Sequence, residues 1–322
     1  PEASDRNLAE GYRYLAGFMH HAVERAFHED ADFPAFRNGL SVYNKSTIDN
    51  ADAIYFYAPI DGKKHYRVHG NIADHRHWRG EARAESGPLA PQYLIFEVHS
   101  GAMSGDSGRT GFGSLDTSSL SVADNGDFEL LLGPEKPAGY SGNFVCTRKP
   151  PSKRNPDGDD RYADYISGRQ LFYDWGREQA IQLNISALDT EGCSPPALDS
   201  ERGAEQLRHM GGIIRGQMHF WLAFYEKVLN CNQRAVEQGR YFMPVNAYNQ
   251  PNAASGDTGG GMSTNIYAGG IFDIADDEAL LIEASYSGEP VYSSIHLGNL
   301  WGESPDYANH QSSLNGFQTH MS

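Results

Sequence analysis

Residues 53–70 read AIYFYAPIDGKKHYRVHG, and this stretch decides the class of the fold. In 53–58 and again in 64–70 the side chains alternate in character, which is the period of two of a β-strand. Asp-Gly, a frequent hairpin turn, lies between the two runs in the segment 59–62. The stretch therefore predicts two antiparallel strands joined by a hairpin.

The same period recurs along the rest of the chain. Further strand-like runs occupy residues 93–99, 120–123, 128–132, 169–175, 180–185, 279–285 and 291–297. Asn125-Gly126 predicts a hairpin between the second and third of these runs, and we expect 169–175 to pair with 180–185. The Gly- and Pro-rich stretches 101–113, 149–160 and 249–261 are expected to form exposed loops.

Two segments carry the 3.6-residue period of a helix instead. Asp5 is a candidate N-cap for the first helix, 5–30, whose apolar face comprises Leu8, Tyr12, Leu15, Met19, Val23 and Phe27. The second helix, 199–230, has an apolar stripe of Leu207, Met210, Ile214, Met218, Trp221, Tyr225 and Val228. Core or interface packing explains this stripe better than a cofactor site. We expect a homo-oligomer with Met218, Trp221 and Tyr225 at the subunit contact, or else a helix packed on its own sheet.

Strands interrupted by two helices, without regular β-α-β alternation, predict a mostly-β α+β fold. The most economical core is an antiparallel β-sandwich or jelly roll, with an N-terminal helix and one long helix near 200–230. We expect an N-terminal helical segment, 1–48, and a β-sandwich-like domain, 49–322, with the helix 199–230 inserted into it.

Composition limits the classes of partner. The 322 residues are 39% hydrophobic and carry a formal charge of −16, which disfavours binding to nucleic acid and to anionic membranes. Every apolar run is shorter than the roughly 20 residues of a membrane helix. Cys146, Cys193 and Cys231 lie far apart, which favours a reducing compartment over a zinc module or a disulfide framework. We therefore expect a cytoplasmic protein with a small-molecule ligand and no cofactor.

The common cofactor and nucleophile motifs do not occur. The sequence has no GxGxxG after a strand, no GxxxxGK[ST], no GxSxG and no HExxH. Dinucleotide enzymes, P-loop NTPases and α/β-hydrolases are therefore disfavoured.

The first of four candidate clusters is rich in histidine and comprises His65, His69, Asp74, His75 and His77. Three imidazoles and a carboxylate could close around a divalent metal. Arg67, Arg76 and Arg79 are interleaved with them, however, and their positive charges oppose a metal ion. A solvated polar edge is the favoured interpretation, and we predict no bound metal.

The second cluster is Glu97 with His99, which share one face of a strand and could form an acid/base pair or an ordinary cross-strand contact. The third lies in residues 294–316, where His296 and His310 could transfer protons while Asn299 and Trp301 line a pocket. The same side chains could instead hold a loop through hydrogen bonds to its backbone.

The fourth cluster is Tyr173-Asp174-Trp175, beside Arg169 and Arg177. Two aromatic rings next to a carboxylate could recognise a ring that bears hydroxyl groups. A buried aromatic residue with a satisfied neighbour is the alternative.

Three stretches, 53–71, 169–185 and 296–318, resemble the domain of unknown function 1214 family, and the similarity covers most of the chain from Asp49 onward. The family-like positions are Tyr57, Tyr66, Gly70, Tyr173, Asp174, Trp175, Asn299, Trp301, Ser304, His310, Ser312 and Asn315. The resemblance implies a jelly-roll-like β-sandwich in a bacterial enzyme or binding protein, often among catabolic functions for hydrophobic compounds. It also implies a further C-terminal segment that this chain lacks, so the predicted site would be incomplete.

Three functions remain open at this point. The favoured one is a cofactor-independent lyase, hydrolase or isomerase that acts by acid/base chemistry on an aromatic or hydrophobic small molecule. Its catalytic candidates are His310, His296, Glu97 and His99, and its substrate-binding candidates are Tyr57, Tyr173, Asp174, Trp175, Asn299 and Trp301. The alternatives are a non-catalytic protein that binds a small molecule or carbohydrate, and a metal-dependent enzyme that uses the histidines in 65–77.

Overall fold

The computed structural model describes residues 4–45, 48–101, 109–151, 158–225, 243–249, 262–285 and 287–319. The chain forms two compact units: Pro1–Gly211 together with Val291–Ser322, and Gly212–Pro290. Parts of the three expected loops, and the end of the second expected helix at 226–230, lie outside the described residues.

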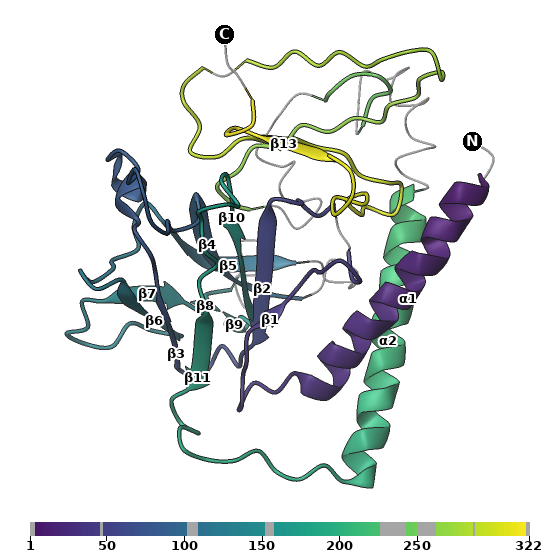
Figure 1. The fold of residues 1–322 in the computed structure, drawn as a ribbon. Helices are drawn as coiled ribbons and strands as arrows, with labels where there is room; N and C mark the ends of the chain where they lie inside the picture. Colours follow the sequence, from purple (N-terminus) through teal and green to yellow (C-terminus); the bar gives the residue numbers. More distant parts are fainter. Residues whose placement is uncertain are drawn as a thin grey trace. The chain divides into compact units, whose positions relative to one another are not determined.

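The first unit contains two sheets, which Figure 1 labels strand by strand. Sheet A has the order β1 (Arg37–Asn38), β2 (Ala53–Pro59), β10 (Tyr165–Leu171), β4 (Tyr93–Ser100) and β5 (Thr110–Asp116). Sheet B has the order β11 (Leu183–Ala187), β3 (Tyr66–Asn71), β6 (Asp127–Gly133) and β7 (Asn143–Cys146). Neighbouring strands are antiparallel except for the parallel pair β6 and β7.

Short elements complete the unit. They are η1 (Arg76–Arg79), the pair β8 (Arg148–Lys149) and β9 (Arg161–Tyr162), and the pair β12 (Ser294–His296) and β13 (Ser313–Asn315).

The hydrophobic core lies between the two sheets. Every second residue of β2 and β4 in sheet A, and of β3 and β6 in sheet B, points into it. The rings of Phe96 from sheet A and Phe128 from sheet B meet there, with their centroids 5.9 Å apart. The predicted mostly-β α+β fold with a sandwich core is therefore confirmed.

The predicted hairpin at 59–62 is wrong, because β2 belongs to sheet A and β3 to sheet B. The turn carries the chain from one sheet to the other and packs against residue 163: Gly62 donates its N–H to the carbonyl of Ala163. A side chain at Gly62 would place its Cβ only 2.6 Å from the backbone of Ala163. The expected pairing of 169–175 with 180–185 is wrong for the same reason, since β10 and β11 also lie in different sheets.

Other strand predictions also need correction. The turn at Asn125-Gly126 exists, with Gly126 at φ +85°, but residues 120–123 that precede it form no strand. Residues 279–285 form none either, and Leu281 is largely exposed there. Conversely, β5 begins at Thr110, inside a stretch expected to be a loop.

α1 (Asp5–His28) begins after Ser4, whose Oγ accepts a hydrogen bond from the N–H of Asn7, so Ser4 rather than Asp5 is the N-cap. Its buried face comprises Tyr14, Phe18, Ala22 and Ala26, and not the apolar stripe that the sequence marks. α2 (Ser200–Tyr225) has the expected start. Among the residues described, no helix combines the length and apolar character needed to cross a membrane.

Candidate functional site

The side of sheet A that faces away from the core is lined by polar and aromatic residues, and we call it the polar face. It comprises Tyr55 and Tyr57 on β2, Tyr165, Ser167 and Arg169 on β10, and Glu97 and His99 on β4. The antiparallel register places Tyr165 opposite His99, and Ser167 between Tyr57 and Glu97. Side chains far apart in the sequence are therefore neighbours on one surface.

His99 lies at the centre of the closest contacts on the polar face, with only 7% of its surface exposed. Its ring stacks on Tyr165, with the centroids 5.5 Å apart, and Nη2 of Arg109 lies 2.6 Å from Nε2. The same Nη2 lies 3.1 Å from Nδ1, and Ser167 Oγ lies 3.5 Å from that nitrogen.

The surroundings of His99 are positively charged. Burial, followed by the charges of Arg109, Arg169 and Lys149 in that order, lowers the pKa of His99 to about 3. The ring is therefore neutral at physiological pH, within a cationic region of a chain whose formal charge is −16. Such a region attracts anions.

α1 lies against the β2 side of the polar face. His21 meets the ring of Tyr57 edge-on at 6.0 Å, and the guanidinium of Arg25 lies 6.0 Å from the same ring. Burial, followed by the charge of Arg25, lowers the pKa of His21 to about 3. The Tyr57 hydroxyl is buried, and burial, followed by the charge of Glu29, raises its pKa.

Glu97 completes the polar face and is 3% exposed. It lies opposite Ser167 on β10 and Ser114 on β5. A serine, a histidine and a glutamate are thus close together, but they do not form a hydrolase triad. In a triad the carboxylate and the serine bind opposite ring nitrogens, whereas here Arg109 occupies Nε2 of His99.

The third predicted cluster forms the scaffold of the C-terminal segment. Asn299 accepts from the N–H groups of Trp301 and Glu303, and its amide donates to the Glu303 carboxylate. Trp301 donates its indole N–H to the carbonyl of Asn7 and stacks on Tyr14 of α1. These contacts hold a loop against a helix, as the alternative interpretation of this cluster supposed.

The two predicted histidines of this segment lie in different surroundings. His296 is partly buried near Asp49 and Asp52; burial lowers its pKa, and the two carboxylates raise it by a smaller amount. His310 is exposed, and its backbone N–H donates to the carbonyl of Asp306. The structure does not bring His310 together with the polar face.

Tyr173, Asp174 and Trp175 also serve as scaffold. The Tyr173 hydroxyl accepts from the N–H of Ser293, and Trp175 donates its indole N–H to Asp52. Asp174 Oδ1 accepts from the N–H of Gly176 and so shapes the turn after β10.

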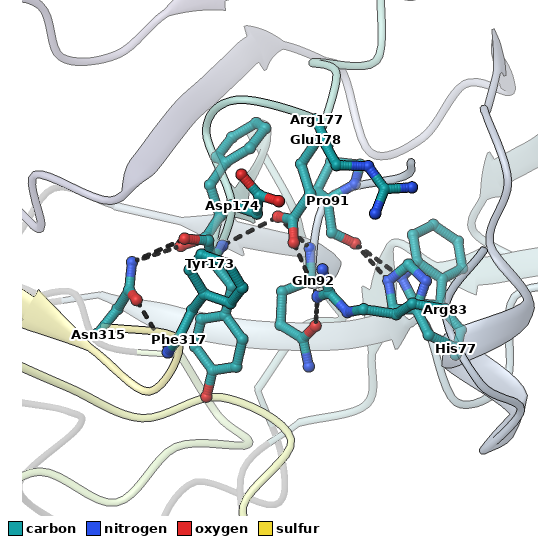
Figure 2. Close-up of polar contacts among 12 residues, drawn as sticks. His77, Arg83, Pro91, Gln92, Tyr173, Asp174, Arg177, Glu178, Asn315 and Phe317 are labelled. Carbon is teal, nitrogen blue, oxygen red and sulfur yellow. Dashed lines mark hydrogen bonds and ion pairs between the residues drawn. The ribbon is translucent and has the colours of Figure 1, made fainter. Parts of the chain in front are cut away.

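Glu178 follows that turn, and Figure 2 shows the polar contacts around it. Its buried carboxylate accepts from the N–H groups of Gln92 and Tyr173 and lies 2.8 Å from Nη2 of Arg83. Arg83 also contacts Gln92, and Asn315 donates to the carbonyl of Tyr173. Every charge in this cluster faces an opposite charge or a backbone dipole.

The first predicted cluster is dispersed. His65 contacts the carbonyl of Glu135, His75 that of Ala73 and His77 that of Pro91, while His69 is exposed. Within the described ranges, no three His, Cys, Asp or Glu side chains lie close enough together to hold a metal ion.

Sequence reasoning missed Arg109, His21 and Arg25. Arg109 lies just before β5, in a stretch expected to be a loop, and the two α1 residues lie outside the predicted apolar stripe. The period of two on β4 placed Glu97 and His99 on one face, and Tyr57, a family-like position predicted to bind substrate, also lies on the polar face.

Comparison with known proteins supports the fold and no more. No family model and no curated protein matches this chain. The crystal structure of an uncharacterised protein from Burkholderia cenocepacia aligns over 99% of this chain and 76% of its own, with a TM-score of 0.73 and 23% identity. The VPA0106 protein from Vibrio parahaemolyticus aligns over 58% of this chain and 40% of its own, with a TM-score of 0.26 and 12% identity. The resemblance to the domain of unknown function 1214 family stays a prediction.

Proposed function

We propose that the protein binds a small aromatic carboxylate on the polar face of sheet A. The observation that carries the proposal is the partly buried contact between Arg109 and His99, on a surface walled by tyrosines. The non-catalytic alternative thus has better support from the geometry than the acid/base enzyme favoured by the sequence.

The charge of the ligand follows from the cations. Arg109, Arg169 and Lys149 all act on His99, and they lie in a chain with excess negative charge. Arg109 and Lys149 are partly exposed, and cations that lie together raise the local potential and attract an anion. Glu97 is one anion on this face, and a ligand carboxylate would add another; arginine binds carboxylates with two parallel hydrogen bonds.

The aromatic part of the ligand follows from the tyrosines. Tyr55, Tyr57 and Tyr165 lie on adjacent strands β2 and β10, and Arg169 already lies over the Tyr55 ring, 4.9 Å from its centroid. Tyrosine rings supply flat apolar surface with a polar edge, which suits an aromatic ring.

His99 is a poor proton acceptor in this arrangement. Its pKa of about 3 makes the ring weakly basic, and Arg109 already donates to Nε2. We assign it a positioning role: the ring holds Arg109 and contributes a flat surface.

The test is a comparison of charged and neutral ligands. Benzoate, 4-hydroxybenzoate and cinnamate should raise the melting temperature, whereas the matched amides should not, because only the anions gain from the arginines. Arg109→Gln should weaken binding at least about 30-fold in calorimetry, since removing a partner of a desolvated charge costs roughly 2–5 kcal/mol. Arg148→Gln, at an exposed arginine paired with Asp160, is the control. Equal binding of acids and amides, or full affinity in Arg109→Gln, would overturn the proposal.

Acid/base catalysis at the same face is the second candidate, because Glu97 is a buried carboxylate next to Ser167 in the register. Glu97→Gln separates the two functions. If the protein is an enzyme, this variant keeps ligand affinity and loses turnover by about 10²–10⁴-fold. If the protein only binds, no ligand is converted by the parent protein either.

A further inference from the structure

The side of sheet B that faces away from the core carries a cleft of about 630 Å³, which falls in the size range of small-molecule sites. We call it the sheet B cleft. Its polar lining consists of six exposed side chains: His69, Asn71, Asp127, Gln179, Gln182 and Asn184. The first two lie on β3 and the third on β6, while the others belong to residues 179–184, which lead into the edge strand β11. The cleft is therefore separate from the polar face of sheet A.

The wall formed by residues 179–184 is held by buried hydrogen bonds. Gln170, which is 2% exposed, accepts from the N–H of Ile181 at 2.7 Å and donates to the carbonyl of the same residue at 3.1 Å. Gly70 of β3 lets this wall come close, because a Cβ there would lie 3.0 Å from the carbonyl oxygen of Gln182. The side chains of the wall are thus presented by a backbone that is fixed before a ligand arrives, which lowers the cost of binding.

Three amides of the cleft are available to a ligand. The side chains of Gln179, Gln182 and Asn184 make no hydrogen bond to another residue in the described part of the chain. Asn71 and Asp127, by contrast, bind each other at 2.8 Å. An amide offers a donor and an acceptor side by side, and a sugar hydroxyl can likewise donate and accept. Three available amides on one wall therefore suit a ligand that carries several hydroxyl groups.

The rest of the lining disfavours other classes of ligand. No lysine or arginine is among the described residues that line the cleft, so an anion finds no strong partner there. The carboxylate of Asp127 already accepts from the amides of Asn71 and Asn125, which leaves it little capacity for a cation. Phe128 is only 5% exposed and gives a flat apolar ligand no wall to stack on. A neutral ligand rich in hydroxyl groups fits the lining best.

From these observations we propose that the sheet B cleft binds a neutral oligosaccharide, whose hydroxyl groups pair with the amides of Gln179, Gln182 and Asn184. His69 lies in register between Asn184 and Glu129, and its imidazole adds a further hydrogen-bonding group. This site differs from the polar face in both its sheet and its ligand, so the two proposals can fail separately.

Calorimetry with maltotriose, cellotriose, xylotriose and chitotriose tests the proposal. At least one of these neutral trisaccharides should bind the parent protein saturably. The triple variant Gln179→Ala, Gln182→Ala, Asn184→Ala should bind it at least about 10-fold more weakly, because several hydrogen bonds are lost. Its circular dichroism spectrum should be unchanged, since the three side chains are exposed. Asn38→Ala, at an exposed asparagine in β1 of sheet A, is the matched control and should keep the affinity. Failure of all four sugars to bind, or full affinity in the triple variant, would overturn the proposal.

Two further comparisons test the class of ligand and the place where it binds. Trigalacturonate, an acidic trisaccharide, should bind more weakly than the neutral sugar, because it lacks a cationic partner among the described lining residues. Tighter binding of the acid would reject a neutral ligand. Arg109→Gln on the polar face should keep the affinity for the sugar, and a loss of that affinity would place the sugar on sheet A instead.

Discussion

Glu178 and His99 are both buried among charged side chains of the same unit, but their neighbours differ in kind. Glu178 faces Arg83 and two backbone N–H groups, so its charge is matched within the protein (Figure 2). His99 is neutral and faces cations, with Arg109 in contact and Arg169 and Lys149 nearby. Opposite charges in direct contact hold elements together, whereas the neutral His99 ring brings no charge to match Arg109, and Glu97 is the carboxylate that shares its face.

The largest expected effect tests the Glu178 cluster, in which opposite charges meet within the protein. Glu178→Ala should lower the free energy of unfolding by about 3–5 kcal/mol, because it leaves the partly buried Arg83 and two N–H groups without this acceptor. Urea denaturation measures the loss. Glu178→Gln keeps one acceptor oxygen and should lose less. A neutral effect of Glu178→Ala would show that this cluster is not scaffold.

The second prediction concerns the contact between α1 and the C-terminal segment. A Cβ at Gly11 would lie 2.5 Å from the Trp301 ring, which is fixed by its hydrogen bond to Asn7. Gly11→Ala should therefore cost about 1–3 kcal/mol of stability through overpacking, even though alanine favours helix. Gly203→Ala on α2, where no atom lies within 4 Å, is the matched control and should gain up to about 1 kcal/mol. If both variants gained stability equally, the Trp301 ring would not lie against Gly11 of α1.

These two contacts show which parts of the structure the sequence could predict. Strands such as β2, β4 and β6 follow from local alternation, and they form where expected. The partner of each strand depends on packing between sheets, so the Asp-Gly turn after β2 gave no information on whether β3 pairs with it. The buried face of α1 uses Gly11 to admit Trp301, and a glycine contributes nothing to an apolar pattern.

The candidate site, like the fold, could be predicted from the sequence only in part. Glu97 and His99 were found because both lie on one strand, where the period alone fixes their common face. Arg109 comes from the start of the neighbouring strand, and only the register between β4 and β5 brings it to His99. In the sequence, the polar residues at 296–310 were as good candidates for a site as Glu97 and His99. The sequence does not show which polar side chains form hydrogen bonds to the backbone.

The third prediction uses the pH dependence of stability to test the lowered pKa of His99. The pKa of His99 is lowered from 6.5 to about 3, so between these values the unfolded chain binds a proton that the folded protein does not. Stability should therefore fall as the pH drops from 6.5 toward 3, by at most about 1.4 kcal/mol per pH unit for this group. His21, whose pKa is also about 3, adds a similar slope.

His99→Gln isolates the contribution of His99. The variant should show a shallower loss of stability between about pH 6 and pH 5, a window in which ordinary carboxylates stay ionised. Urea denaturation at several pH values measures the slope. A slope identical to that of the parent would mean that the pKa of His99 is not lowered in the folded protein.

The smallest expected effect is that of His310→Ala. The exposed imidazole lies on a loop whose fold depends on Asn299 and on the backbone hydrogen bond from residue 310 to Asp306, and alanine keeps that bond. Stability should change by less than about 0.5 kcal/mol, as for surface substitutions in general. Affinity for an aromatic carboxylate should also be unchanged, whereas His99→Ala should reduce it because Arg109 loses its support. Calorimetry on the two variants decides between the regions: if His310→Ala loses affinity and His99→Ala keeps it, the ligand binds at the C-terminal segment and the sheet face is scaffold.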